Sequence, residues 1–252
     1  MGKEMKVIVI PDVHLKPWMF DAAERIMREK EIDTAVCLGD IADDWKKAFQ
    51  IGLYEETYDR AIQFAKKSVT SQWVYGNHDL CYQLNYREPG YSVMASRIVC
   101  EKLAELERVL ADTGRELTYV KRIGRAVFSH GGLSAGFAGE VEEQEGRSLS
   151  VESTEDLDGL ISRINAVPKY RVWRDDSPVW FRPQYESGAL ELPGYLQVVG
   201  HTPVKEPEIR SGILSVDLFS THADGTPVGT QEFAIIDTET LEVTFEKAAV
   251  IS

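Results

Sequence analysis

Five short runs of apolar residues dominate the pattern of the chain. Each is almost continuously hydrophobic over a strand length, which is typical of β-strands buried on both faces of an α/β sheet. Between these runs, apolar residues recur at helical spacing, as in Phe20, Ala23, Ile26 and Met27. Alternating strands and helices predict an α/β fold. The five strand-like runs are residues 7–10, 35–38, 73–75, 126–128 and 196–199.

The remaining sequence predicts a single domain over 1–252 with two elaborations. The first, at about 81–115, carries leucines at helical spacing among charged residues and is expected to be helical. The second lies at about 135–192, where Thr154 is expected to cap a helix. Within it, residues 136–147 hold four glutamates without periodicity, which predicts an exposed acidic loop or flap.

The tail of the chain predicts further β structure. Residues 213–216, 233–236 and 241–245 have strand-like composition, and the last two are separated by a polar turn. We expect these strands to complete a second sheet.

A carboxylate, amide or imidazole follows each of the five strand-like runs. One such residue is commonly a turn former or a helix cap. Five of them in order indicate a site, because ligands bind beyond the carboxyl ends of strands in α/β sheets. The five segments are Pro11-Asp12-Val13-His14, Gly39-Asp40-Ile41-Ala42-Asp43, Gly76-Asn77-His78-Asp79, Ser129-His130-Gly131-Gly132 and Gly200-His201-Thr202.

Convergence of these segments would bring Asp12, Asp40, Asp43 and Asp79 into one crevice. So many carboxylates cannot all stay ionised without a counter-charge, and divalent cations supply one. A mixture of imidazole, carboxylate and amide ligands favours Mn, Fe, Zn or Ni over a calcium cage.

The net charge of the chain limits the kinds of partner that it is expected to bind. The chain has 28 Lys and Arg against 41 Asp and Glu, a net charge of −13. This argues against broad binding to nucleic acid or anionic membranes, which requires a positive field. A phosphorylated substrate, a small molecule or a nucleotide, remains compatible, because bound metal ions reverse the local sign.

The expected location is the cytoplasm. Three cysteines without a Cys-x-x-Cys pair suggest free thiols in a reducing compartment. The first residues show no cleavage pattern of a signal peptide, and no apolar run approaches the length of a membrane span.

The five motifs, in this order, resemble those of the calcineurin-like metallophosphoesterase superfamily over residues 6 to about 203. Residues 129–134 and 200–203 look most like the PPP branch, which contains Ser/Thr protein phosphatases and symmetrical diadenosine tetraphosphate hydrolases. The resemblance implies two packed mixed β-sheets flanked by helices, with a dinuclear metal site at the strand ends. Pro203 stands where related families have a further histidine ligand, so the first metal would have three protein ligands. The implied ligands are Asp12, His14 and Asp40 for the first metal, and Asp40, Asn77, His130 and His201 for the second.

The resemblance also implies a reaction. Metal-bound hydroxide attacks phosphorus in line, His78 donates a proton to the leaving group, and Asp43 orients His78. The chain is therefore expected to hydrolyse a phosphomonoester or a nucleotide-like phosphate. Two alternatives stay open, a phosphodiesterase or nuclease and a catalytically weak metal-binding scaffold. His222 lies outside every motif and is expected to be an ordinary loop residue.

One position departs from the PPP pattern. Protein phosphatases of that branch have an arginine that holds the substrate phosphate, and this chain has Asp44 there. The reversed charge argues against protein phosphatase and tetraphosphate hydrolase activity. Arg174 and Arg182 are candidates for a compensating phosphate contact, because each lies near a tryptophan that is suited to walling a cleft.

Overall fold

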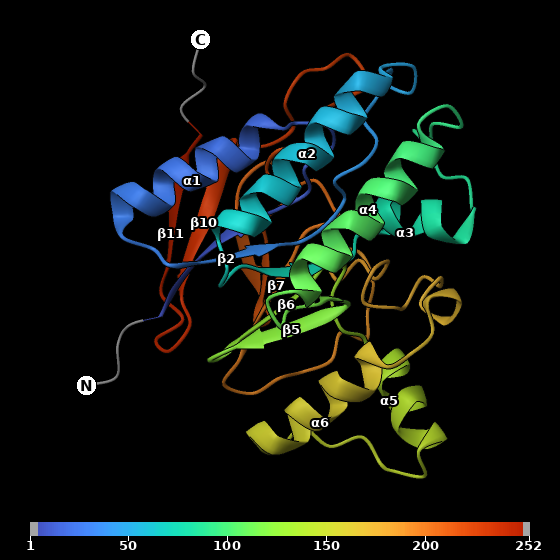
Figure 1. Cartoon of the computed structure of the whole chain (residues 1–252). Helices are drawn as coiled ribbons and strands as arrows, with labels where there is room; N and C mark the ends of the chain where they lie inside the picture. The colour runs from blue at the N-terminus through green and yellow to red at the C-terminus, as the bar shows by residue number, and fades with distance from the viewer. Residues whose placement is uncertain (1–4, 249–252) are drawn as a thin grey trace.

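The computed structural model describes residues 5–248, whose strands form two mixed β-sheets (Figure 1). In the first sheet the strands are ordered β11-β10-β1-β2-β3-β4. Strands β1 to β4 run parallel to one another. Strand β10 runs antiparallel to β1, and β11 runs antiparallel to β10. Its strands are β1 (Lys6–Ile10), β2 (Thr34–Cys37), β3 (Gln72–Val74), β4 (Leu117–Thr118), β10 (Glu232–Asp237) and β11 (Val243–Lys247).

The second sheet has the order β5-β6-β7-β9-β8. Its three central strands are parallel, and both edge strands are antiparallel to their neighbours. The strands are β5 (Val120–Ile123), β6 (Ala126–Ser129), β7 (Leu196–Val199), β8 (Glu208–Arg210) and β9 (Ile213–Ser215). All five strand-like runs of the sequence thus form strands, and the predicted pair of mixed sheets is confirmed.

The two sheets pack face to face because β1 is apolar on both sides. Val7 and Val9 belong to the core between the sheets, together with Phe128 and Val198 of the second sheet. Ile8, which alternates with them, belongs to the core beneath the helices. Since successive side chains of a strand point to opposite faces, continuous hydrophobicity is what a central layer requires.

Helices cover the outer faces. Figure 1 shows α1, α2 and α4 together over the first sheet, and α5 and α6 beside β5 of the second. The predicted helical segment after residue 81 is confirmed in α3 and α4. Their bounds are α1 (Trp18–Lys30), α2 (Ile51–Lys67), α3 (Asn77–Leu84), α4 (Ser96–Ala111), α5 (Ala135–Gln144), α6 (Thr154–Asn165) and the short 3₁₀ helix η1 (Lys169–Arg171).

Three sequence expectations were wrong in detail. Residues 136–147 are largely helix α5, whose buried Glu142 pairs with Arg163 of α6, rather than an exposed loop. Helix α6 is capped by Ser153, whose hydroxyl accepts from the N–H of Asp156, and not by Thr154. The last two strands, β10 and β11, extend the first sheet through β1, so only β9 of the predicted tail strands joins the second.

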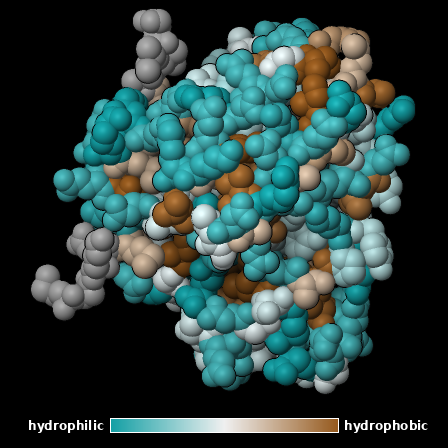
Figure 2. All heavy atoms as spheres, in the orientation of Figure 1, coloured by the Kyte–Doolittle hydropathy of each residue, from teal (hydrophilic) through white to brown (hydrophobic). Residues whose placement is uncertain are grey.

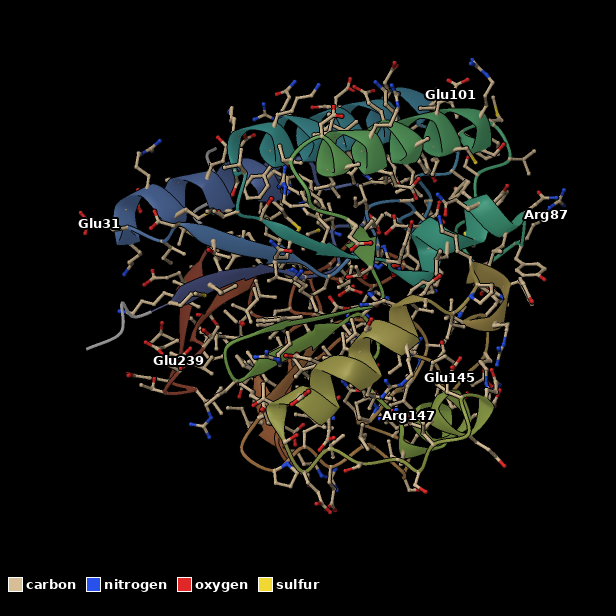
Figure 3. All side chains as sticks on the ribbon, turned by 60° about the horizontal axis from the view of Figure 1, so that its bottom comes forward. Glu31, Arg87, Glu101, Glu145, Arg147 and Glu239 are labelled. Carbon is tan, nitrogen blue, oxygen red and sulfur yellow. The ribbon has the colours of Figure 1, made fainter. Side chains whose placement is uncertain are left out.

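The surface agrees with the charge of the chain. Figure 2 shows a mostly hydrophilic face with limited hydrophobic patches, and in Figure 3 charged side chains such as Glu31, Glu101 and Glu239 extend outward from different elements. Within residues 5–248 no helix has both the length and the hydropathy to cross a bilayer.

Candidate metal centre

The carboxyl ends of strands from both sheets meet at one place. Asp12 follows β1, Asp40 follows β2, and Asn77 begins α3 directly after β3. From the second sheet, His130 follows β6 and His201 follows β7. Strands β1, β2 and β3 are neighbours, as are β6 and β7, so the sheet order itself brings these five side chains together.

Two glycines allow the segments to approach closely. A Cβ on Gly76 would lie 2.0 Å from Oδ1 of Asp40, and a Cβ on Gly200 would lie 2.2 Å from Oδ2 of Asp12. The backbone N–H groups of the residues near these glycines hold the same carboxylates: His78 donates to Asp40 at 2.8 Å and His201 donates to Asp12 at 2.9 Å. The glycine in each motif is therefore a steric requirement of the site.

One half of the centre is built around His130. Its Nδ1 donates to the carbonyl oxygen of Leu38 at 2.9 Å. Its Nε2 faces Oδ1 of Asn77 at 2.9 Å, Nδ1 of His201 at 3.2 Å and Oδ2 of Asp40 at 3.3 Å. Three acceptor-type atoms thus converge on a ring nitrogen that has at most one proton to offer, so the set requires a positive charge at its centre.

The other half is built around His14. Its Nδ1 donates to the carbonyl oxygen of Asp43 at 2.9 Å, which leaves Nε2 directed toward Oδ2 of Asp40 at 3.8 Å. Burial lowers the pKa of His14, so the ring is neutral and its Nε2 lone pair is available. A backbone carbonyl that fixes the ring in this way is the usual partner of a metal-ligating histidine.

Asp40 belongs to both halves. Ligand atoms of Asp40, His130 and His201 lie within 4.8 Å of one another, and so do those of Asp12, His14 and Asp40. The residues present therefore fit two neighbouring cations that share one carboxylate. Asn77 adds an amide oxygen to the first group, and carboxylate, imidazole and amide donors together suit first-row transition metals.

The candidate ligands crowd several buried charges into one place. Burial raises the pKa of Asp12 well above its ordinary value, and Asp217 raises it further. Burial acts the same way on Asp40, but His130 and His78 hold its pKa far below the ordinary range. Burial opposes a charge on His130, yet Asp40 and Asp12 raise its pKa to about 9. Without metal, a proton on His130 offsets part of the carboxylate charge, and a metal ion takes its place.

Beside the candidate metal ligands, His78 and Asp43 form a hydrogen-bonded pair. His78 Nδ1 lies 3.0 Å from Oδ2 of Asp43. The hydroxyl groups of Tyr54 and Tyr82 both donate to the other carboxylate oxygen of Asp43. Asp43 is buried, and His78 is 18% exposed at the pocket. Burial opposes the charged form of His78, but Asp40 and Asp43 raise the pKa of this histidine to about 9.

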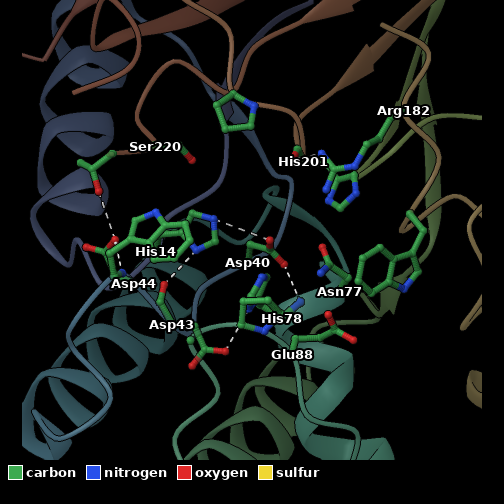
Figure 4. Close-up of a pocket in the computed structure, with 16 residues that line it drawn as sticks. His14, Asp40, Asp43, Asp44, Asn77, His78, Glu88, Arg182, His201 and Ser220 are labelled. Carbon is green, nitrogen blue, oxygen red and sulfur yellow. Dashed lines mark hydrogen bonds and ion pairs between the residues drawn. The ribbon is translucent and has the colours of Figure 1, made fainter. Parts of the chain in front are cut away.

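These groups line a pocket of about 280 Å³ (Figure 4). His14, Asp40, Asn77, His78 and His201 form its floor, and Arg182 lies at its side. Asp12 and His130 lie behind this surface and are fully buried.

The two candidate arginines lie in different surroundings. Arg182 Nη1 donates to the carbonyl oxygen of His201 and to the hydroxyl of Thr202, both at 3.0 Å. Arg174 is outside the residues that line the pocket and pairs with Glu140 and Asp176. The structure therefore brings Arg182 to the site and leaves Arg174 away from it. His222, as expected, is an exposed loop residue.

Three other side chains differ from the expectations or were absent from them. Asp79 points away from the pocket and accepts from the N–H of Ile41 and the hydroxyl of Tyr58. Asp217 was missed, although it follows β9 as the other aspartates follow their strands and is fully buried near Asp12. Tyr54 carried no motif signal, but its helix α2 was detectable from the helical spacing of its buried residues.

Comparison with known proteins agrees with this geometry. The family model described as calcineurin-like phosphoesterase matches residues 5–218. The chain belongs to this family. As a member of this family, it is a phosphate ester hydrolase of the metallophosphoesterase type. The residues matched extend from β1 to just beyond β9, and thus include every strand end that contributes to the centre.

One solved structure shares the fold at low sequence identity. A Saccharomyces cerevisiae protein serine/threonine phosphatase with similarity to human phosphatase PP5 matches with a TM-score of 0.55 and 11% identity, covering 100% of this chain and 82% of that one. A metallophosphoesterase from Sphaerobacter thermophilus matches with a TM-score of 0.44 and 16% identity, covering 97% and 88%. No curated protein sequence in the comparison matches the chain.

Proposed function

We propose that this phosphoesterase uses a dinuclear metal centre to hydrolyse phosphate monoesters. The observation that carries the proposal is Asp40, whose carboxylate is common to two groups of ligand atoms that each lie within 4.8 Å of one another. Asp12, His14 and Asp40 would hold one cation, and Asp40, Asn77, His130 and His201 the other. These donors suit Mn, Fe, Zn or Ni. The cytoplasmic location, which the cysteine pattern suggests, stays a prediction.

When bound, the two cations would supply charge to the phosphoryl oxygens and acidify water for the attack. The residues of the chain do the rest. Arg182 offers a guanidinium to the phosphate at the side of the pocket, which Arg174 is not placed to do. His78 lies at the pocket surface, and its contact with Asp43 favours the protonated ring that would donate to a leaving alkoxide.

Asp43 would position His78 without touching the substrate. Its contact with Nδ1 leaves Nε2 as the proton-donating atom. Two tyrosine hydroxyls fix the carboxylate, and burial keeps water from competing for it. The pair can therefore keep the imidazolium in one orientation during proton transfer.

The test compares p-nitrophenyl phosphate with bis(p-nitrophenyl) phosphate, using protein reconstituted with Mn²⁺. A monoesterase hydrolyses the first faster. A preference for the diester would replace the proposal with a phosphodiesterase. Normal metal content without turnover of either ester would indicate a metal-binding scaffold.

A further inference from the structure

Two carboxylates stand at the mouth of the pocket, where a phosphate group alone does not explain them. Asp44 follows β2, and Glu88 lies in the loop between α3 and α4. Both line the pocket beside the metal ligands. Figure 4 shows Asp44 on the side of His14 and Glu88 beside His78 and Asn77. Both carboxylates therefore share the pocket with His78, the proposed proton donor.

Asp44 is held in place. Its Oδ1 accepts from the hydroxyl of Thr221 at 3.1 Å and from the backbone N–H of Trp45 at 2.8 Å. Thr221 lies in the segment after β9, so two distant parts of the chain fix the carboxylate at the rim. A solvated charge on a mobile side chain would not need such support.

Few cations are available to neutralise these carboxylates, and the buried Lys16, whose charge acts on Asp44, acts on Asp217 and Asp12 as well. Among the described residues that line the pocket there is no lysine, and the arginine present is Arg182. Its Nη1 already donates to His201 and Thr202. Asp44 also stands where the PPP pattern has a phosphate-holding arginine, so the sign of the charge at the rim is reversed.

An aromatic face accompanies the negative charge. Trp45 lines the pocket next to Asp44 and is 51% exposed. An indole face beside carboxylates attracts organic cations through both cation–π and ionic interactions. The floor of the same pocket also awaits an occupant: His201, a candidate metal ligand, is 7% exposed and its Nε2 has no hydrogen-bond partner among the described residues.

We propose that the pocket selects phosphate monoesters whose alcohol carries an ammonium group, with the phosphate at the metal ligands and the ammonium near Asp44, Trp45 and Glu88. This rests on the proposed monoesterase function. The ammonium of a short amino alcohol lies only a few bonds from the oxygen that His78 protonates, so it reaches the rim. The same carboxylates repel the additional phosphates of a nucleoside polyphosphate.

The test uses two esters of nearly identical shape. Choline phosphate carries a trimethylammonium group, and 3,3-dimethylbutyl phosphate has a neutral tert-butyl group in its place. The full chain reconstituted with Mn²⁺ should show a kcat/KM about tenfold higher for choline phosphate. This preference should shrink as salt is added, because the rim is open to solvent.

Variants assign the preference to the two carboxylates. Asp44→Asn and Glu88→Gln should each lower the ratio of the two kcat/KM values several-fold, and the double variant should bring it close to one. Glu145→Gln, at the exposed end of α5, is the matched control and should keep the wild-type ratio (Figure 3). Metal content and thermal unfolding of each variant establish that it is folded.

Two outcomes would overturn the inference. Equal kcat/KM values for the two esters in the wild type would show that the rim does not discriminate between a charged and a neutral alcohol. A preference that survives both substitutions would place its origin elsewhere. In both of these outcomes, hydrolysis of the neutral ester would still support the proposed monoesterase function. If no monoester is hydrolysed, the monoesterase function and the ammonium selectivity are both refuted.

Discussion

Nδ1 of His78 lies 3.0 Å from Oδ2 of Asp43, and the other oxygen of that carboxylate accepts hydrogen bonds from Tyr54 and Tyr82. The imidazole is thus oriented by a carboxylate that is itself fixed by two phenols. These residues come from three segments, the loop after β2, α2 and α3, so the arrangement depends on the packing of α2 and α3 around that loop.

His78→Ala should slow hydrolysis in a way that depends on the leaving group. Proton donation matters most when the leaving alkoxide is strongly basic, so phenyl phosphate should be slowed by about 10²-fold or more. p-Nitrophenyl phosphate should be affected much less. His222→Ala, a substitution in an exposed loop, is the control. Equal slowing of both esters would mean that His78 is not the proton donor.

Asp40→Asn should remove both metals together. The carboxylate is shared by the two ligand groups, so its loss weakens each of them. Turnover should fall by at least about 10²-fold, and metal analysis should show far less than the wild-type content. Asp112→Asn, at the exposed end of α4, should leave both quantities unchanged. Wild-type metal content in Asp40→Asn would refute a bridging role.

Tyr82→Phe should reduce stability as well as catalysis. The Tyr82 hydroxyl donates to Asp43 and accepts from the N–H of Ser92 at 2.8 Å, so the change leaves two buried groups with fewer partners. The free energy of unfolding should fall by about 1–3 kcal/mol in urea titrations. Tyr170→Phe, a change at a residue that is 65% exposed, should alter the free energy of unfolding little. An unchanged unfolding free energy for Tyr82→Phe would show that these bonds do not stabilise the fold.

The metal-free protein should lose stability as pH rises from about 6.5 to about 9. His78 and His130 have folded pKa values of about 9, above the ordinary value near 6.5. Burial lowers both pKa values, but it is outweighed by Asp40 together with Asp43 at His78 and by Asp40 together with Asp12 at His130. In this window the folded chain holds more protons than the unfolded chain, so the unfolding free energy falls with pH.

Two measurements check this pH dependence. Urea titrations of EDTA-treated protein across the window should show the decline. Addition of Zn²⁺ to the metal-free protein near neutral pH should release protons, which a pH-stat records. A flat or rising stability profile, or metal binding without proton release, would contradict the charge balance described here.

The candidate residues at the strand ends could be predicted because each closely follows a strand that is recognisable from the local sequence. Val7 to Ile10 predicts a buried strand, and Asp12 follows it at the edge where ligands bind. Tyr82 and Glu88 carry no such local signal. Their place at the site depends on how α3 and the following loop pack against the segment after β2, which is a tertiary contact that no spacing reveals.

Sheet membership of the last strands was harder still. Residues 233–236 have the composition of a buried strand, but both sheets offer an apolar face and an open edge. The choice is made by pairing of β10 with β1 at the opposite end of the chain. The acidic helix α5 escaped notice because its glutamates and glycines leave only two large apolar residues, Phe137 and Val141. These two lie one helical turn apart, and Ser134 caps the helix.

The most direct test of the account is an anomalous-difference map from crystals of the protein grown with Mn²⁺. The account predicts two peaks about 3.5–4 Å apart, with the carboxylate of Asp40 between them, His14 at one peak and His130 at the other. A single peak, or two peaks too far apart to share Asp40, would contradict it.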